Sequence, residues 1–98
     1  MPKLDIYIVN VISHYIFLIA NMTKQEKIID TFLKQHNVNA VDIVKIEKNV
    51  YEFEIPLMAE VFKAYKVNYK HHIVEGYDMY FEHKSKHFFK VTLNKIKN

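Results

Sequence analysis

Cysteine is absent from this chain of 98 residues, and glycine and proline are scarce, with one and two residues. Without cysteine there is no disulfide framework and no thiolate zinc site, which argues against a small secreted scaffold and against thiol catalysis. The single glycine excludes a glycine-rich phosphate loop. We therefore expect a cytoplasmic protein of one globular domain, built from regular elements joined by short turns.

Arginine is also missing, so all fourteen basic residues are lysines. The guanidinium group reads guanine and phosphate through paired hydrogen bonds, and a sequence-specific DNA reader without it would be unusual. The lysine-rich composition is also typical of low-GC coding sequence. The charge is uneven, because residues 1–62 carry a net −2 and residues 63–98 a net +5.

No pattern of catalytic residues emerges. The two serines, Ser13 and Ser85, lack the Gly-x-Ser-x-Gly setting of a nucleophile. His83 and His87 have an H-x3-H spacing, but on a hairpin turn the two rings need not converge, so we interpret them as solvated turn histidines. We expect a protein that is not an enzyme and that uses no metal and no cofactor.

Residues 1–21 form an apolar N-terminal segment that precedes a domain spanning residues 22–98. A membrane helix needs about 20 mainly apolar residues, and the run over residues 4–20 is shorter and includes Asp5. Three interpretations stay open. The segment is a buried strand or helix, a membrane-inserted segment, or an extension upstream of the domain.

Two segments carry strong local patterns. Thr23-Lys24-Gln25-Glu26 matches a capping box, and apolar residues recur behind it at helical spacing, which predicts a helix from Thr23 to His36 that ends at Asn37 and Asn39. From residue 41 the spacing of the apolar residues changes from helical to a period of two residues. Residues 41–55 are predicted to form two strands around a Glu47-Lys48-Asn49 turn, with a buried side made by Tyr51, Phe53 and Ile55.

A second helix is predicted from Pro56 to Asn68, because proline favours the first helical turn and apolar residues recur behind it. Its apolar stripe contains Leu57, Met58, Val61, Phe62 and Tyr65, with Glu60, Lys63 and Lys66 on the opposite side. The remaining residues are predicted to form a long hairpin. A bulge at Gly76 would let Val74 share the inner face with Tyr77.

The element order α-β-β-α-β-β predicts an α+β two-layer sandwich, with an antiparallel sheet and two helices on one face. If residues 4–12 add a strand, the order is similar to that of a ferredoxin-like sandwich. That resemblance covers element order only, and the fold hosts many unrelated functions.

The outer face of such a sheet would expose Tyr80 and Phe88 next to Lys90, amid mixed charge. Aromatic anchors within a charged rim are typical of a protein-docking patch. We therefore expect a small non-enzymatic binding module that docks on a protein partner, with homodimerisation through the same face as a further expectation. Its size and composition are similar to those of phage and mobile-element accessory proteins, which often inhibit a host factor.

Two alternatives remain. Lysines and tyrosines interleave in the second half of the chain, which favours binding of single-stranded nucleic acid by cations and stacking rings. The residues of this alternative are Lys63, Lys66, Lys70, Tyr65 and Tyr69. The other alternative is a small protein anchored in a membrane through residues 4–20.

Overall fold

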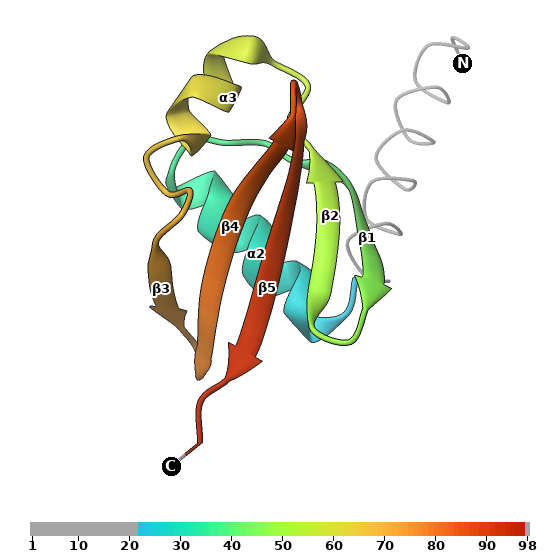
Figure 1. Cartoon of the computed structure of the whole chain (residues 1–98), viewed down its shortest axis with the longest axis vertical. Coiled ribbons are helices and arrows are strands. Elements are labelled where there is room, and N and C mark those ends of the chain that lie inside the picture. The colour runs from blue at the N-terminus through green and yellow to red at the C-terminus, as the bar shows by residue number, and fades with distance from the viewer. Residues whose placement is uncertain (1–21, 98) are drawn as a thin grey trace, which may run out of the picture.

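The protein was analysed as a computed structural model, which describes residues 22–97. The interpretations of residues 1–21, including a strand over residues 4–12 and a membrane segment over residues 4–20, lie outside the described residues. Figure 1 shows a sheet crossed on one face by helix α2 (Lys24–Gln35), with helix α3 (Met58–Ala64) at one end. Within this part of the chain, neither helix has the length and apolar character to cross a membrane.

The strands form one five-stranded antiparallel sheet in the order β1-β2-β5-β4-β3. Their bounds are β1 Val41–Glu47, β2 Val50–Glu54, β3 His71–Val74, β4 Tyr77–Ser85 and β5 Phe88–Lys95. The predicted α+β class, with an antiparallel sheet and two helices, is confirmed. The two edge strands of this sheet are β1 and β3, so a further strand could join the sheet only beside one of them.

Helix α2 begins where its capping residues predict. The Thr23 hydroxyl oxygen accepts a hydrogen bond from the backbone N–H of Glu26 at 3.2 Å. The helix ends at Gln35, and Asn37 follows with a φ of 59°, as an asparagine stop requires. The buried residues are those of the predicted apolar stripe: Ile28, Ile29, Phe32 and Leu33.

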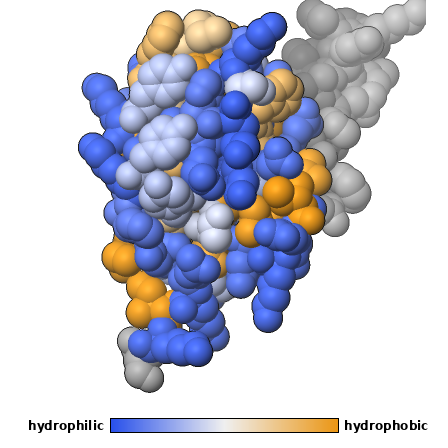
Figure 2. All heavy atoms as spheres, in the orientation of Figure 1, coloured by the Kyte–Doolittle hydropathy of each residue, from blue (hydrophilic) through white to orange (hydrophobic). Residues whose placement is uncertain are grey.

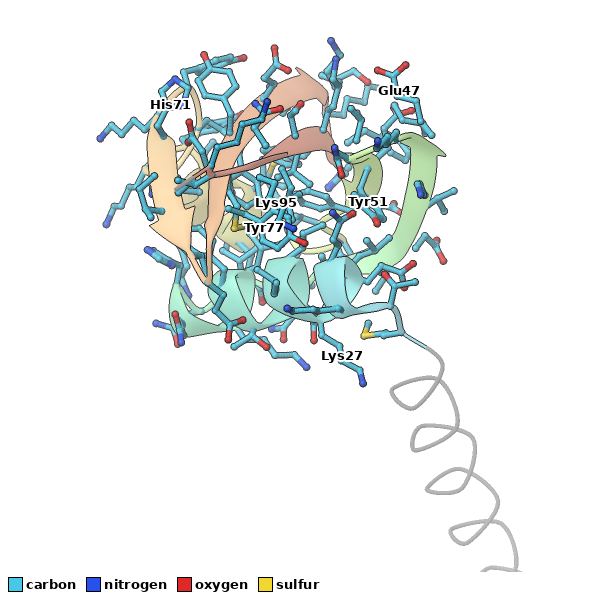
Figure 3. All side chains as sticks on the ribbon, turned by 90° about the horizontal axis from the view of Figure 1, so that it is seen from below. Lys27, Glu47, Tyr51, His71, Tyr77 and Lys95 are labelled. Atoms are coloured by element: carbon cyan, nitrogen blue, oxygen red, sulfur yellow. The ribbon has the colours of Figure 1, made fainter. Side chains whose placement is uncertain are left out.

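The core lies between α2 and the inner face of the sheet, and alternation along the strands fills it as predicted. In Figure 3, Tyr51 and Tyr77 lie between the sheet and α2, whereas His71 lies on the side away from the helix. The Tyr51 hydroxyl donates to Gln25 Oε1 at 2.7 Å, and Gln25 Nε2 donates to Asn49 Oδ1 at 2.9 Å. These two bonds fix the start of α2 against the turn between β1 and β2.

The predicted bulge at Gly76 is wrong. Glu75 and Gly76 form the two-residue turn between β3 and β4, with φ values of 48° and 85°. Two positive φ values are characteristic of a type I′ hairpin turn, whose twist matches that of the strands. Val74 still contacts the core beside Tyr77, because the two residues are paired across this turn. The turn makes β3 a separate fifth strand.

The predicted second helix differs in length and in its buried side. Helix α3 covers seven residues, and the residues that it buries are Val61, Ala64 and Glu60. Glu60 was predicted on the polar side, but it is only 9% exposed and accepts a hydrogen bond from the backbone N–H of Asn39 at 2.6 Å. This bond ties α3 to the loop that follows α2.

Candidate functional site

The structure has two exposed surfaces that carry aromatic and basic side chains. The first is the outer sheet face, formed by the strand residues that point away from α2. Its members include Glu52, Glu54, His71, Asp78, Tyr80, Glu82, Phe88, Lys90 and Thr92. The predicted docking residues Tyr80, Phe88 and Lys90 all lie on this face.

Tyr80 and Phe88 do not meet on the outer sheet face. Tyr80 pairs with Thr92, and Phe88 lies four residues from Thr92 along β5, a separation of about 13 Å in an extended strand. Lys90 occupies the row between them, where it is paired with Glu82 on β4 and with Glu52 on β2. The structure therefore separates the two aromatic anchors by a row of charged side chains.

Polar groups on the outer sheet face find partners on the same sheet. Lys90 Nζ lies 3.8 Å from Glu82 Oε2, and His71 Nδ1 lies 3.0 Å from Asp78 Oδ1. The half-buried Tyr80 ring lies 4.8 Å from the His71 ring. Much of this face is accordingly a charged surface whose members contact one another.

The second surface, which we call the α3 surface, consists of five large apolar or aromatic side chains at the α3 end of the sheet. They are Leu57 (60% exposed), Met58 (46%), Phe62 (60%), Tyr65 (44%) and Tyr69 (59%). In Figure 2, apolar side chains gather at the α3 end and beside β1, and hydrophilic side chains cover the middle of the sheet.

Helical spacing explains why these side chains share a surface. Met58, Phe62 and Tyr65 follow one another at intervals of four and three residues, which places them on one side of α3. Val61 and Ala64 occupy the neighbouring side and enter the core. The apolar part of α3 is therefore wider than the area that the sheet covers, and the excess faces solvent.

Ring contacts connect the α3 surface to the core. The rings of Phe62 and Tyr65 are 5.8 Å apart, and the Tyr65 ring lies 5.3 Å from His83, which in turn lies 4.9 Å from the buried Phe89. The Tyr69 hydroxyl donates to the carbonyl oxygen of His83 at 3.2 Å. The end of β4 thus holds both tyrosines in place while leaving much of each ring exposed.

Five exposed lysines accompany the α3 surface. They are Lys63, Lys66, Lys70, Lys84 and Lys86. Among residues 22–97, none of the five forms an ion pair. The structure thus leaves all five residues of the nucleic-acid alternative exposed, in and just after α3. Sequence reasoning missed the exposure of Leu57, Met58 and Phe62, since a helical apolar stripe is ordinarily a buried one.

The histidines near this end of the sheet serve as hydrogen-bond partners of the backbone. His83 Nε2 lies 2.9 Å from the carbonyl oxygen of Lys86, and His87 Nδ1 lies 2.9 Å from that of Ile55. A carbonyl oxygen only accepts, so each of these ring nitrogens carries the proton. In the part of the chain that the structure describes, no three histidine or acidic side chains are placed to hold a metal ion.

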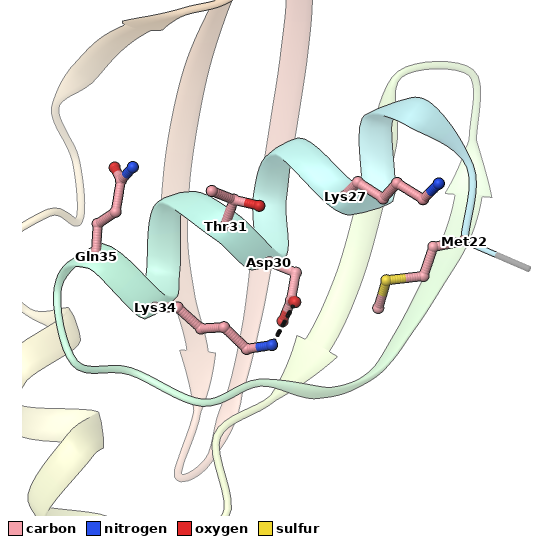
Figure 4. Close-up of a pocket in the computed structure, with 6 residues that line it drawn as sticks. All are labelled: Met22, Lys27, Asp30, Thr31, Lys34 and Gln35. Carbon is pink, nitrogen blue, oxygen red and sulfur yellow. Dashed lines mark ion pairs between the residues drawn. The ribbon is translucent and has the colours of Figure 1, made fainter. Parts of the chain in front are cut away.

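A hollow of about 490 Å³ lies on the outer side of α2 (Figure 4). Its lining residues are Met22, Lys27, Asp30, Thr31, Lys34 and Gln35. Asp30 and Lys34 form an ion pair at 2.9 Å, one helical turn apart. Five of its six lining side chains are polar, and Lys27, Thr31, Lys34 and Gln35 are exposed, so the hollow belongs to the solvated side of α2.

Comparison of the chain with models of known protein families, with curated proteins and with solved structures finds no match.

Proposed function

We propose that this protein is a non-enzymatic binding module that docks on a protein partner through the α3 surface. The observation that carries the proposal is the exposure of five large apolar or aromatic side chains at the α3 end of a well-packed scaffold, where the rings of Phe62 and Tyr65 contact each other. Clustered apolar side chains of this kind mark interaction sites, whereas scattered ones do not. The host-factor inhibition, phage or mobile-element role and cytoplasmic location expected from the sequence are compatible with this proposal.

The chemistry of the α3 surface favours a protein over a nucleic acid. Phe62 and Tyr65 can act as aromatic anchors, which commonly carry most of the affinity at protein interfaces. Leu57 and Met58 offer neither a charge to a phosphate nor an aromatic ring to a base, but burying such a side chain contributes about 1.5–3 kcal/mol. An apolar surface on a protein partner could contact all four of these side chains.

Two phenylalanines allow a matched test of the proposal. Phe62 on α3 is 60% exposed and Phe88 on the outer sheet face is 49% exposed, so replacing either one by serine should leave the fold intact. In pull-downs from cells of the native host, we expect Phe62→Ser to lower capture of the partner at least tenfold and Phe88→Ser to leave it unchanged. The reverse result would move the docking site to the patch of Tyr80, Phe88 and Lys90.

The proposal also gives a role to the outer sheet face. We propose it as the contact of a homodimer of two-layer sandwiches, since the row of alternating charge formed by Glu52, Lys90 and Glu82 could pair with that of a second copy. Sedimentation measurements on the full chain and on the Phe88→Ser variant would test this contact. If the full chain sediments as a monomer at all concentrations, that result would contradict the homodimer contact.

A second candidate function is the binding of single-stranded nucleic acid. The observation that favours it is the exposure of Tyr65 and Tyr69 beside Lys63, Lys66 and Lys70. Titration with a fluorescent oligothymidylate at rising salt would test it, because phosphate binding weakens steeply with salt concentration. If no binding occurs at low salt, the protein partner remains the better proposal.

A further inference from the structure

We infer that the segment of the partner that docks on the α3 surface is an acidic peptide segment with large apolar side chains. This inference rests on the proposed function and adds the chemistry of the partner. It follows from the charges that surround the apolar side chains and from the ways in which those charges are partnered.

Among residues 22–97, the lysines near the α3 surface form no ion pair, in contrast to Lys34 and Lys90. Lys34 pairs with Asp30, and Lys90 pairs with Glu82. Residues 57–70 and 83–88, by contrast, carry five lysines and a single acid, Glu60. That acid is buried and accepts hydrogen bonds from the backbone and side chain of Asn39. Its carboxylate is therefore already in use within the fold.

The two lysine-bearing segments meet at His83. The Tyr65 ring packs on the His83 ring, and the Tyr69 hydroxyl bonds to the His83 carbonyl oxygen. Lys84 and Lys86 follow His83 at the tip of the β4–β5 hairpin. Lysines thus lie next to the exposed aromatic side chains both on α3 and on the neighbouring hairpin.

Such a surface selects its partner by charge and holds it by apolar contact. Several like charges around one apolar area repel one another, and an acidic segment relieves that repulsion when it docks. Complementary charge also speeds the encounter of the two molecules and disfavours basic partners. The apolar side chains require the same segment to present large apolar residues, which a polyphosphate backbone does not offer.

Selection from a display library of short random peptides on the full-length protein would test this inference. We expect the recovered peptides to be enriched in aspartate and glutamate together with large apolar residues. A synthetic peptide of the recovered sequence should bind Lys63→Glu/Lys66→Glu about tenfold more weakly than the unchanged protein, and a Lys63→Gln/Lys66→Gln variant should show an intermediate loss. The matched control is Lys45→Glu/Lys48→Glu at the β1–β2 hairpin, which should bind within about twofold of the unchanged protein.

The outcomes separate the inference from the proposed function. Recovered peptides that depend on Phe62 but are neutral or basic would overturn the acidic partner and leave the docking surface standing. Peptides that bind Phe62→Ser as well as the unchanged protein would overturn the docking surface itself. Failure to recover any peptide, with oligothymidylate binding that is lost in the Lys63→Glu/Lys66→Glu variant, would overturn both in favour of nucleic acid.

Discussion

The α3 surface and the outer sheet face both expose aromatic rings and lysines, but they differ in whether the lysines form ion pairs among the described residues. On the outer sheet face, Lys90 contacts Glu82 and the Tyr80 ring lies against His71. On the α3 surface, Phe62 is 60% exposed, and the neighbouring Lys63 has no ion-pair partner within residues 22–97. Similar residue types therefore include an ion-paired lysine on one surface and lysines without an ion pair on the other.

The secondary structure explains this difference. Antiparallel register sets each outward residue opposite one on the neighbouring strand, which places Lys90 between Glu52 and Glu82 in one row of the sheet. Helix α3 has seven residues and touches the rest of the protein along one side only. Its other apolar side, which carries Met58 and Phe62, is covered by no other helix or strand among residues 22–97. The lesson is that residue type alone does not tell whether a charged side chain on a surface is paired with a neighbour, whereas the contacts in the structure do.

The largest expected effect tests whether the α3 surface lies outside the core. Phe81 is 1% exposed and stacks on Phe32 at 5.4 Å, so Phe81→Ala should lower the free energy of unfolding by about 3–5 kcal/mol. Phe62→Ala should change it by no more than about 0.5 kcal/mol. Urea denaturation followed by circular dichroism measures both variants. A comparable loss in Phe62→Ala would mean that Phe62 supports the fold, and the contrast between the two surfaces would then fail.

A smaller effect distinguishes the acids of the two regions. Glu60→Ala removes the charged acceptor of a partly buried hydrogen bond from the Asn39 backbone N–H, and the loss of a bond of this kind should cost about 1.5–3 kcal/mol. Glu82→Ala removes a partly exposed ion pair with Lys90 and should cost no more than about 1 kcal/mol. Hydrogen exchange of the Asn39 amide gives a local readout, because it should become faster only in Glu60→Ala. Equal protection in the two variants would contradict the anchoring role of Glu60.

Features that depend on neighbouring residues could be predicted from the sequence. The start of α2 follows from the hydroxyl of Thr23 and the amide of Glu26, three residues apart. The buried side of β2 follows from alternation, which places Tyr51 and Phe53 inward and Glu52 outward. In both cases the physical cause is contained within a few residues of the chain.

Features that depend on contacts between distant segments could not be predicted in the same way. The α3 pattern indicates an apolar stripe, but the side that is buried depends on the sheet and on Asn39, which lies 21 residues from Glu60. The strand β3 has only four residues, and it is a strand because it pairs with β4 across the turn at Glu75 and Gly76. The two-sided partnering of Lys90 likewise requires the register of three strands.

The smallest expected effect tests that partnering directly. Lys90 lies between Glu52 and Glu82, so Lys90→Met leaves two carboxylates facing one another across β5 and should lower the free energy of unfolding by about 0.5–1 kcal/mol. Lys66→Met removes a lysine that has no ion-pair partner among the described residues, so stability should stay unchanged or rise slightly as net charge falls. Urea denaturation at low and high salt measures the difference, which should shrink at high salt because salt screens exposed carboxylates. If the two variants lose the same stability at low salt, the lysines of the two regions are equivalent, and the α3 surface then has no excess of unpartnered charge with which to select an acidic partner.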